Sequence, residues 1–185
     1  MVFSDLGIRR LIEQGLLKVV PFADSSIRPA SICLHLSDDL LIFEGAKTVV
    51  DLDDSATFPN SRRISMSTTG NYELLPNQFL LGATKESIAL SKQLVGHVSN
   101  ISGLARLGIS VALSTHIAPG FGESLSRPLT LEIYNASSSI IRLRPSIRIC
   151  HLLISPVEPT ASVGYDDMFP KKYINPSPGS SEYSD

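Results

Sequence analysis

Two charged residues stand in apolar surroundings, in positions where they could take part in acid–base chemistry. Arg106 interrupts the stretch SGLARLGISV, residues 102–111, and Glu132 interrupts LTLEIYN, residues 129–135. A carboxylate held in a cleft can act as a general base or acid. A nearby arginine offsets the cost of its ionised form and offers donors to developing negative charge. Each charge also has an ordinary interpretation, because most charged side chains are simply solvated. These residues alone leave both interpretations open.

The first stretch predicts a short helical turn. Ser102 is a candidate cap, and Leu104 and Leu107 are expected to face the core, while Ser102 and Arg106, four residues apart, share the other face. Gly103 leaves the backbone open to close approach, and free N–H groups at a helix start suit an anion such as phosphate. The alternative is a capped connector whose arginine is solvated.

The second stretch predicts a strand. Alternation places Leu129, Leu131 and Ile133 on one face and Thr130, Glu132 and Tyr134 on the other. The carboxylate is therefore expected to point away from the main core. Periodicity does not distinguish a catalytic carboxylate from an ordinary exposed strand residue.

Several common catalytic patterns are missing from the sequence. The four histidines and two cysteines show no ligand spacing typical of zinc, and there is no P-loop, no dinucleotide-binding G-x-G-x-x-G and no G-x-S-x-G elbow. His116 is either a lone base or a histidine satisfied by nearby backbone. An enzyme built from this sequence would depend on arginine, serine, glutamate and backbone dipoles, without zinc or a protein-bound metal.

The rest of the pattern predicts an all-β fold. A short helix is expected between Ser4 and Gly15, followed by many β-branched runs of period two that are separated by turn residues about every ten positions. This indicates a sandwich or barrel. Residues 90–98, LSKQLVGHV, are expected to interrupt the strand pattern. Composition changes near Pro156, which divides the chain into a β domain, 1–156, and a tail, 157–185.

Composition restricts the partners and the location. Sixteen Lys and Arg against eighteen Asp and Glu give a net charge of −2, which argues against binding of long nucleic acid but permits one small anionic ligand. The N-terminus lacks a signal-peptide pattern, and no apolar run reaches the ~18 residues that a membrane helix needs. Cys33 and Cys150 lie in apolar runs as expected of free thiols. We therefore expect a soluble cytoplasmic protein with no membrane partner.

The order of the segments resembles the dCTP deaminases of the trimeric dUTPase superfamily. The resemblance runs through YELLPNQFLLGATKESIAL, LVGHVSNISGLARLGISV, HIAPGF, LTLEIYN and IRICHLLIS, with similar opening (SDLGIRRLIEQGLLKVVPF) and closing (KKYINPSPGSS) segments. It covers nearly the whole chain. Its most specific part is S-x-L-A-R-L-G followed about twenty-five residues later by L-E-x-x-N.

The resemblance implies a dUTPase-like distorted β-barrel (β-clip), a homotrimer with active sites between subunits, and a C-terminal tail that folds over the nucleotide. It implies zinc-independent deamination of dCTP to dUTP and ammonia, with Mg²⁺ carried by the triphosphate. In this family pattern Glu132 activates water, Arg106 stabilises the site, and Ser102 contacts phosphate or the catalytic water. The implied nucleotide contacts are Ser102, Gly103, Thr115, His116, Ala118, Tyr134, His151, Lys172 and Tyr173.

The chain departs from the family pattern at several of these positions. Ile101 stands where an arginine usually reaches the phosphates, Ala118 where an aspartate usually meets the sugar, and His151 where a glutamine is usual. Arg127 in an inserted loop, or the lysines at 171 and 172, are candidates for replacing the lost positive charge. Two other functions therefore stay open: a dUTP pyrophosphatase, and a non-catalytic trimer that binds a nucleotide or a protein.

Overall fold

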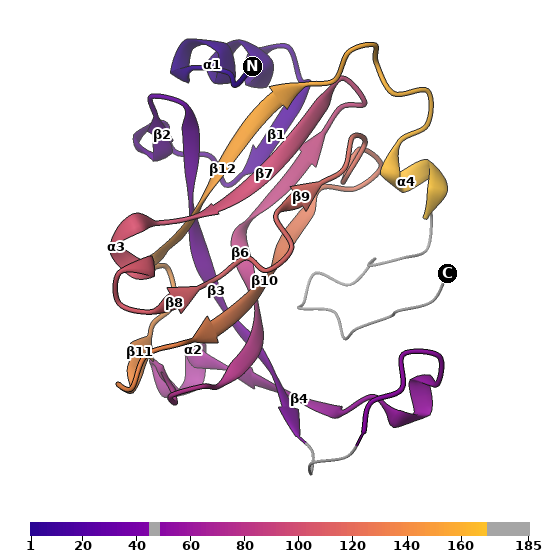
Figure 1. Cartoon of the computed structure of the whole chain (residues 1–185). Helices are drawn as coiled ribbons and strands as arrows, with labels where there is room; N and C mark the ends of the chain where they lie inside the picture. Colours follow the sequence, from indigo (N-terminus) through magenta and orange to yellow (C-terminus); the bar gives the residue numbers. More distant parts are fainter. Residues whose placement is uncertain (45–48, 170–185) are drawn as a thin grey trace.

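Strands dominate the computed structural model, which describes residues 1–44 and 49–169. The all-β prediction is confirmed (Figure 1). The helices are α1 (Asp5–Glu13), α2 (Met66–Thr69), α3 (Ser102–Ala105) and α4 (Tyr165–Met168). The strands are β1 (Leu17–Val20), β2 (Ile27–Arg28), β3 (Ser31–Glu44), β4 (Asn60–Ser65), β5 (Tyr72–Leu74), β6 (Phe79–Leu90), β7 (Leu94–Asn100), β8 (Ile109–Ser110), β9 (His116–Ile117), β10 (Arg127–Asn135), β11 (Ile141–Leu143) and β12 (Arg148–Pro156).

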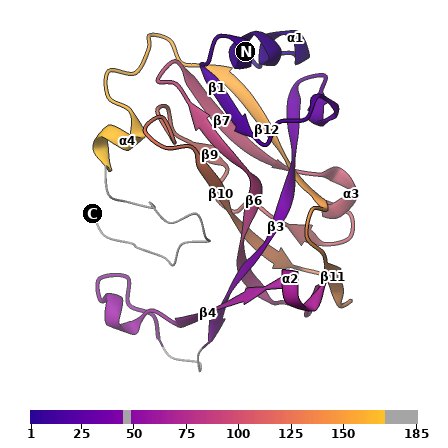
Figure 2. The same ribbon diagram turned by 180° about the vertical axis from the view of Figure 1, so that it is seen from behind.

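One curled sheet contains ten of these strands. Its order is β8-β10-β6-β3-β12-β7-β9, with β1 paired to β6 and both β2 and β4 paired to β3, while β5 and β11 form a separate pair. The long strand β3 connects the two halves of the sheet. Its first part pairs with β12 through residues 32–35, and its second part pairs with β4 and β6 (Figure 2). The buried aliphatic side chains from both halves form one core.

The sheet is irregular where β6 changes its register with both neighbours, and buried polar groups satisfy the backbone there. Thr84 donates to the carbonyl of Glu86 at 2.7 Å and accepts from the N–H of Leu129 at 2.9 Å. The carboxylate of Glu86, only 5% exposed, accepts from the backbone N–H of His35 at 2.9 Å and lies 2.7 Å from its ring Nδ1. These contacts replace ladder hydrogen bonds that a bulge removes.

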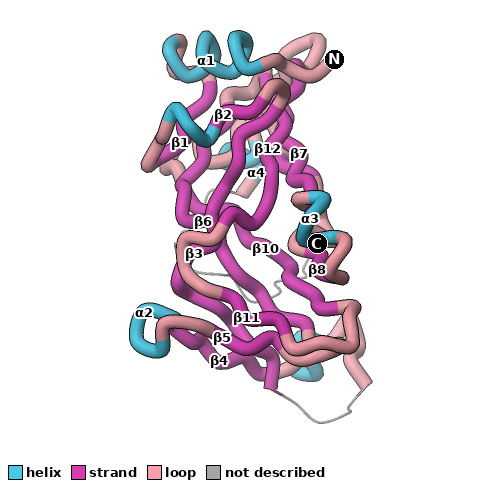
Figure 3. Tube along the Cα trace, turned by 90° about the vertical axis from the view of Figure 1, so that its left-hand side faces the viewer, coloured by secondary structure: helices cyan, strands magenta, loops and turns pink. Residues whose placement is uncertain are grey.

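The N-terminal helix forms where the sequence predicted it. Ser4 is the N-cap of α1 and accepts from the N–H of Gly7, and the chain leaves the helix through Gly15 at φ +71°. Ile8 and Leu11 enter the core, so α1 packs across one end of the sheet (Figure 3). None of the helices in residues 1–44 and 49–169 has the length and apolarity needed to cross a membrane.

The predicted interruption at residues 90–98 was wrong. β6 continues to Leu90, a tight turn follows, and β7 begins at Leu94, so this segment joins two strands that pair with other strands and not with each other. The glycine in the middle of β7 explains the misleading pattern. A Cβ on Gly96 would lie 3.1 Å from the side chain of Ile117, so glycine there permits close packing of a continuous strand.

The chain continues past the last strand as a segment that is hydrogen-bonded to the turn between β6 and β7. After β12 ends at Pro156, Val157 donates to the carbonyl of Gln93 at 2.8 Å and Ala161 to that of Lys92 at 3.2 Å. This segment ends in α4, which lies beside the loop that follows β9 (Figure 1). The division into a domain and a tail stays a prediction.

Candidate active site

Glu132 lies on β10 with its side chain half-buried and turned away from the core. The alternation on this strand agrees with the prediction, because Leu131 and Ile133 are fully buried on either side. Its Oε2 atom accepts hydrogen bonds from the backbone N–H groups of Leu113 and Ser114, both at 3.2 Å. Two donors on one oxygen fix the orientation of the carboxylate.

The loop that supplies these two donors is itself held at both ends. The side chain of Asn100 accepts from the N–H of Val111 at 2.9 Å, and the carbonyl of Thr115 accepts from the N–H of Val98 at 2.8 Å. Both partners are at the end of β7. The position of the Glu132 carboxylate therefore depends on β7 as well as on its own strand. No pattern in the sequence indicated this role for Asn100.

The turn that carries Ser102 and Arg106 is α3, a single helical turn. Its N-cap is Ile101, which makes no side-chain capping bond, so the prediction that Ser102 is the cap was wrong. Leu104 packs against the core as predicted, but Leu107 is 62% exposed. The turn closes immediately through tight backbone bonds from Leu107 and Gly108 to residues three positions earlier, which carries Leu107 out of the core.

The two sequence motifs meet at the end of α3. Gly108 adopts φ +83°, and a Cβ there would lie 2.9 Å from both the backbone N and the Cβ of Ser137. The N–H of Ala136 donates to the carbonyl of Gly108 at 2.8 Å, and β8 pairs with β10 through Ile109 and Asn135. The glycine of L-A-R-L-G is therefore required by the backbone geometry.

The asparagine of L-E-x-x-N has a structural role. Asn135 is fully buried, and its amide nitrogen donates to the carbonyls of Leu74 at 3.2 Å and Ser139 at 2.8 Å. Its oxygen accepts from the N–H and hydroxyl of Ser137 at 3.0 and 2.7 Å. It holds the turn after β10 closed.

Arg106 does not reach Glu132 within one chain. Its side chain is exposed, and no ion pair among the described residues joins it to a carboxylate. α3 lies beside β8 at the edge of the sheet (Figure 1). The single chain thus connects the two segments through Gly108 without forming the predicted pair of side chains.

The histidines proposed from the sequence lie on the same half of the sheet. His116 is exposed and stands directly opposite His97 on β7, with the ring centroids 6.1 Å apart. His151 is half-buried on β12, and its Nδ1 lies 3.2 Å from the hydroxyl of Ser31. Burial lowers the pKa of His151, and the positive charges of two nearby arginines, Arg28 and Arg148, lower it further.

The remaining predicted contacts are dispersed. Tyr134 donates from its hydroxyl to Asn77 at 3.3 Å, and Gly103 is exposed with open space around it. The carbonyl of Ala118 accepts from the N–H of Phe121 at 3.2 Å. Lys172 and Tyr173 lie outside the described residues.

Arg127 already has a carboxylate partner. Its Nη2 donates to Asp166 at 2.7 Å, and the two side chains are only 11% and 9% exposed. Its charge is matched inside the chain, which favours a structural role for Arg127 over direct binding of phosphate. In the part of the chain that the structure describes, no three His, Cys, Asp or Glu side chains converge in a way that could hold a metal ion.

Comparison with known proteins decides the family. Residues 2–157 match the family described as dCTP deaminase-like.

The chain belongs to the dCTP deaminase-like family.

Its relatives include a protein from Sulfurihydrogenibium named "dCTP deaminase, dUMP-forming", 33% identical over 165 residues that cover 89% of each chain. A protein from Haloarcula marismortui named "dCTP deaminase" is 31% identical over 184 residues, which cover 94% of this chain and 89% of the relative. A similar solved structure is the 2'-deoxycytidine 5'-triphosphate deaminase from Agrobacterium tumefaciens, with a TM-score of 0.59 and 21% identity. The match covers 83% of this chain and 46% of that one, and it supports the fold.

Proposed function

We propose that this dCTP deaminase-like chain hydrolyses the amino group of the cytosine in dCTP, giving dUTP and ammonia. The match to the family and the names of relatives that cover most of the chain support this activity. The observation that carries the assignment of the site is the Glu132 carboxylate, half-buried on β10 and oriented by the N–H groups of Leu113 and Ser114.

The mechanism follows from the two oxygens of this carboxylate. Oε2 is engaged by the two N–H donors, whereas Oε1 accepts no hydrogen bond from the described residues. We assign Oε1 as the base that takes a proton from water while the water oxygen attacks C4 of cytosine. Glu132 then returns the proton to the departing nitrogen, the C4–N bond breaks and ammonia leaves. The guanidinium of Arg106 would stabilise negative charge as it develops, and the hydroxyl of Ser102 would contact phosphate or water.

We propose that the complete site forms between subunits of a homotrimer. Arg106 and Glu132 do not meet within one chain, and apolar side chains are exposed near both. Leu107 follows Arg106 and is 62% exposed, and Leu113 donates to Glu132 while its side chain is 64% exposed. A second copy that covers these leucines would bury apolar area and could bring its own Arg106 to the carboxylate.

The metal requirement follows from the nucleotide. Because no cluster of metal-binding side chains is found in residues 1–44 and 49–169, the donors that fit Mg²⁺ are the phosphate oxygens of the substrate and water. When bound, the ion would neutralise charge on the triphosphate. Both cysteines are free and buried, which is compatible with a reducing cytoplasm, where we place the enzyme.

The first experiment separates the candidate activities. The purified protein is incubated with dCTP, dUTP, CTP or dCMP in the presence of Mg²⁺, and ammonia and pyrophosphate are measured separately. Ammonia from dCTP supports deamination, pyrophosphate from dUTP alone indicates a pyrophosphatase, and no reaction with any nucleotide supports the non-catalytic trimer.

A second experiment tests whether the site is shared. Arg106→Ala and Glu132→Gln proteins, each inactive alone, are mixed under conditions that allow subunits to exchange. If each site takes Arg106 from one subunit and Glu132 from another, random mixing restores activity to about a quarter of the sites. Failure to recover activity, with exchange demonstrated, would place both residues in a site within one chain.

Hydrolysis of the product to dUMP is the second candidate activity. The relative from Sulfurihydrogenibium is one of several whose names describe them as dUMP-forming. Ala118 stands where an aspartate would bind or activate water in dUTP hydrolysis, which argues against this step. Equal amounts of ammonia and pyrophosphate from dCTP would establish it.

A further inference from the structure

Two histidines face each other across neighbouring strands beside the candidate active site. His97 on β7 and His116 on β9 are direct partners in the antiparallel register, and their ring centroids lie 6.1 Å apart. Both residues are exposed. Within residues 1–44 and 49–169, neither ring takes part in a hydrogen bond or an ion pair, in contrast to the rings of His35 and His151. The ring nitrogens of this pair are therefore open to a ligand from solution.

The backbone brings the two side chains as close together as an antiparallel pair allows. The next pair along these strands is joined by a hydrogen bond from the N–H of Val98 to the carbonyl of Thr115, at 2.8 Å. Hydrogen-bonded and non-hydrogen-bonded pairs alternate along an antiparallel ladder, so His97 and His116 form a non-hydrogen-bonded pair. Opposite side chains approach most closely at such pairs, and both rings can turn toward one point between the strands.

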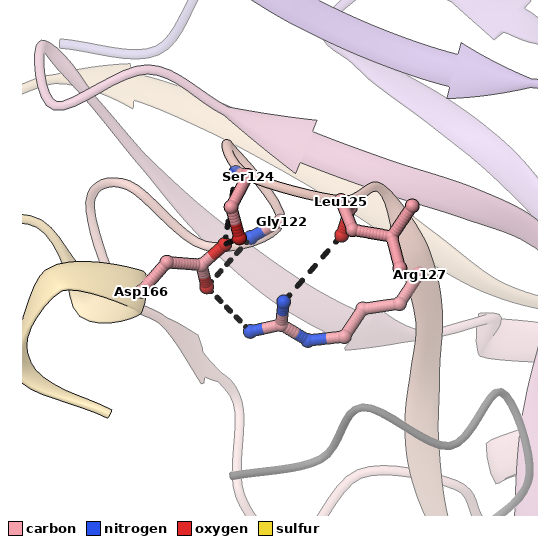
Figure 4. A network of polar contacts seen from close by, with 5 residues as sticks. All are labelled: Gly122, Ser124, Leu125, Arg127 and Asp166. Atoms are coloured by element: carbon pink, nitrogen blue, oxygen red, sulfur yellow. Dashed lines mark hydrogen bonds and ion pairs between the residues drawn. The ribbon is translucent and has the colours of Figure 1, made fainter. Parts of the chain in front are cut away.

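The strand β9 has only two residues, but the chain is fixed on both sides of it. The segment before it is bonded to β7, and the segment after it is bonded to α4. There the N–H of Tyr165 donates to the carbonyl of Pro119 at 2.7 Å. The carboxylate of Asp166 accepts from the N–H of Gly122 at 3.2 Å and from Nη2 of Arg127 at 2.7 Å (Figure 4). A pair of side chains that is positioned before a ligand arrives loses less entropy on binding it.

Two imidazoles that turn toward one point can chelate a transition-metal ion. Neutral imidazole nitrogen suits Zn²⁺, Ni²⁺ and Cu²⁺, with zinc–nitrogen distances of about 2.0–2.1 Å, whereas Mg²⁺ and Ca²⁺ prefer oxygen. Two protein ligands leave the other coordination positions to water, so the affinity should be lower than that of a closed site with four protein ligands. Without a ligand the pair contributes little to the sheet, because two protonated histidines directly opposite each other repel.

We propose that His97 and His116 bind a divalent transition-metal ion of the zinc, nickel and copper class, and that this ion clips β9 to β7. The site is separate from the Mg²⁺ that the triphosphate carries, and the ion takes no part in the proposed deamination. Its effect reaches the candidate active site through the segment just before β9. Leu113 and Ser114 in that segment donate their N–H groups to the Glu132 carboxylate, so the clip restrains the loop that orients it. Metal binding at this pair does not rest on the proposed function.

The first test measures binding of Ni²⁺ to the untagged full-length protein by calorimetry. We expect one ion per chain, and His97→Gln and His116→Gln should each raise the Kd about tenfold or more, because each removes one of the two ligands. The matched control is His151→Gln, which removes a histidine from the same half of the sheet and should change the Kd less than about twofold. A Kd for Ni²⁺ that is the same in the parent and in His97→Gln would overturn the proposal.

A second test separates a clip between strands from an ion on the surface. With free Ni²⁺ at ten times its Kd, the Tm of the parent should rise by about 3–6 °C, and that of His97→Gln by less than about 1 °C. Amide hydrogen exchange at Leu113 and Ser114 should become slower with Ni²⁺ in the parent and stay the same in His97→Gln. Binding that changes neither the Tm nor this exchange would indicate an adventitious ion only and overturn the clip. An equal rise in Tm in His97→Gln would place the ion elsewhere and overturn the site.

Discussion

A backbone hydrogen bond of 2.8 Å joins Ala136 to Gly108, and it connects the strand of Glu132 to the turn of Arg106. Ser137 lies so close to Gly108 that no side chain fits there. Two motifs that are separated in the sequence are therefore held in one fixed arrangement by the backbone. The chain by itself therefore presents the turn of Arg106 and the strand of Glu132 at set positions.

Substitution of Gly108 should destabilise the protein. Gly108→Ala places a Cβ 2.9 Å from Ser137 at φ +83°, and we expect a loss of about 1–3 kcal/mol in the free energy of unfolding. The control is Gly103→Ala, where no atom lies within 4 Å. That change should stabilise the folded chain by about 0.4–1 kcal/mol. Urea unfolding of the two variants measures the difference, and equal stabilities would contradict the proposed constraint.

The buried carboxylate at the irregular part of the sheet should contribute to stability. Glu86→Gln replaces the charge-assisted hydrogen bonds between the carboxylate and the two His35 nitrogens with weaker neutral ones, and we expect a loss of about 1–3 kcal/mol. Glu73→Gln, which weakens an exposed pair with Arg142, should change stability by less than about 0.5 kcal/mol. Similar midpoints in urea would show that the Glu86 contact is dispensable.

Stability should fall in mild acid partly because of His151. Its pKa in the folded protein is below the value of an unfolded chain, so the unfolded state binds more protons as the pH falls through about 6.5. The contribution of His151 to the free energy of unfolding is therefore complete above that pH. It is lost as the pH falls to the lower pKa that His151 has in the folded protein. His151→Gln should therefore lose less stability than the parent between pH 7.5 and pH 5. An identical pH dependence in both proteins would argue against this role.

Arg106 should affect catalysis more than folding. Because its side chain is exposed and has no ion pair among the described residues, Arg106→Ala should leave the Tm unchanged. Loss of a donor that stabilises transition-state charge should lower kcat about a hundredfold or more. Arg106→Lys should recover only part of the rate, since a lysine lacks the fork geometry. Near-normal turnover by Arg106→Ala would make the arginine an ordinary surface residue.

Local patterns predicted the elements better than the contacts between them. Alternation placed Glu132 on the outer face of β10, and the cap at Ser4 located α1, because both depend on neighbours in the sequence. The strand β7 was missed at its start because Gly96 resembles a break, although the contact of Gly96 with Ile117 makes it part of a strand. That contact packs β7 against β9, and no pattern among neighbouring residues in the sequence predicts it.

The sequence singled out candidate site residues, which stay a prediction, but not the geometry in which the fold holds them. The order of the motifs singled out Arg106 and Glu132, and family membership is now established from residues 2–157. The roles of Asn100 and Asn135 could not be predicted, because their hydrogen bonds close loops that bring distant segments together. Arg127 was noted for its charge, and only the fold shows that Asp166 neutralises it.

The most direct measurement is ammonia release from dCTP by the Glu132→Gln protein. The substitution removes the base but keeps the shape, so we expect a folded, correctly assembled protein that binds dCTP and releases ammonia at least about a thousandfold more slowly than the parent. Near-normal ammonia release by this variant would contradict the assignment of Glu132 as the residue that activates water.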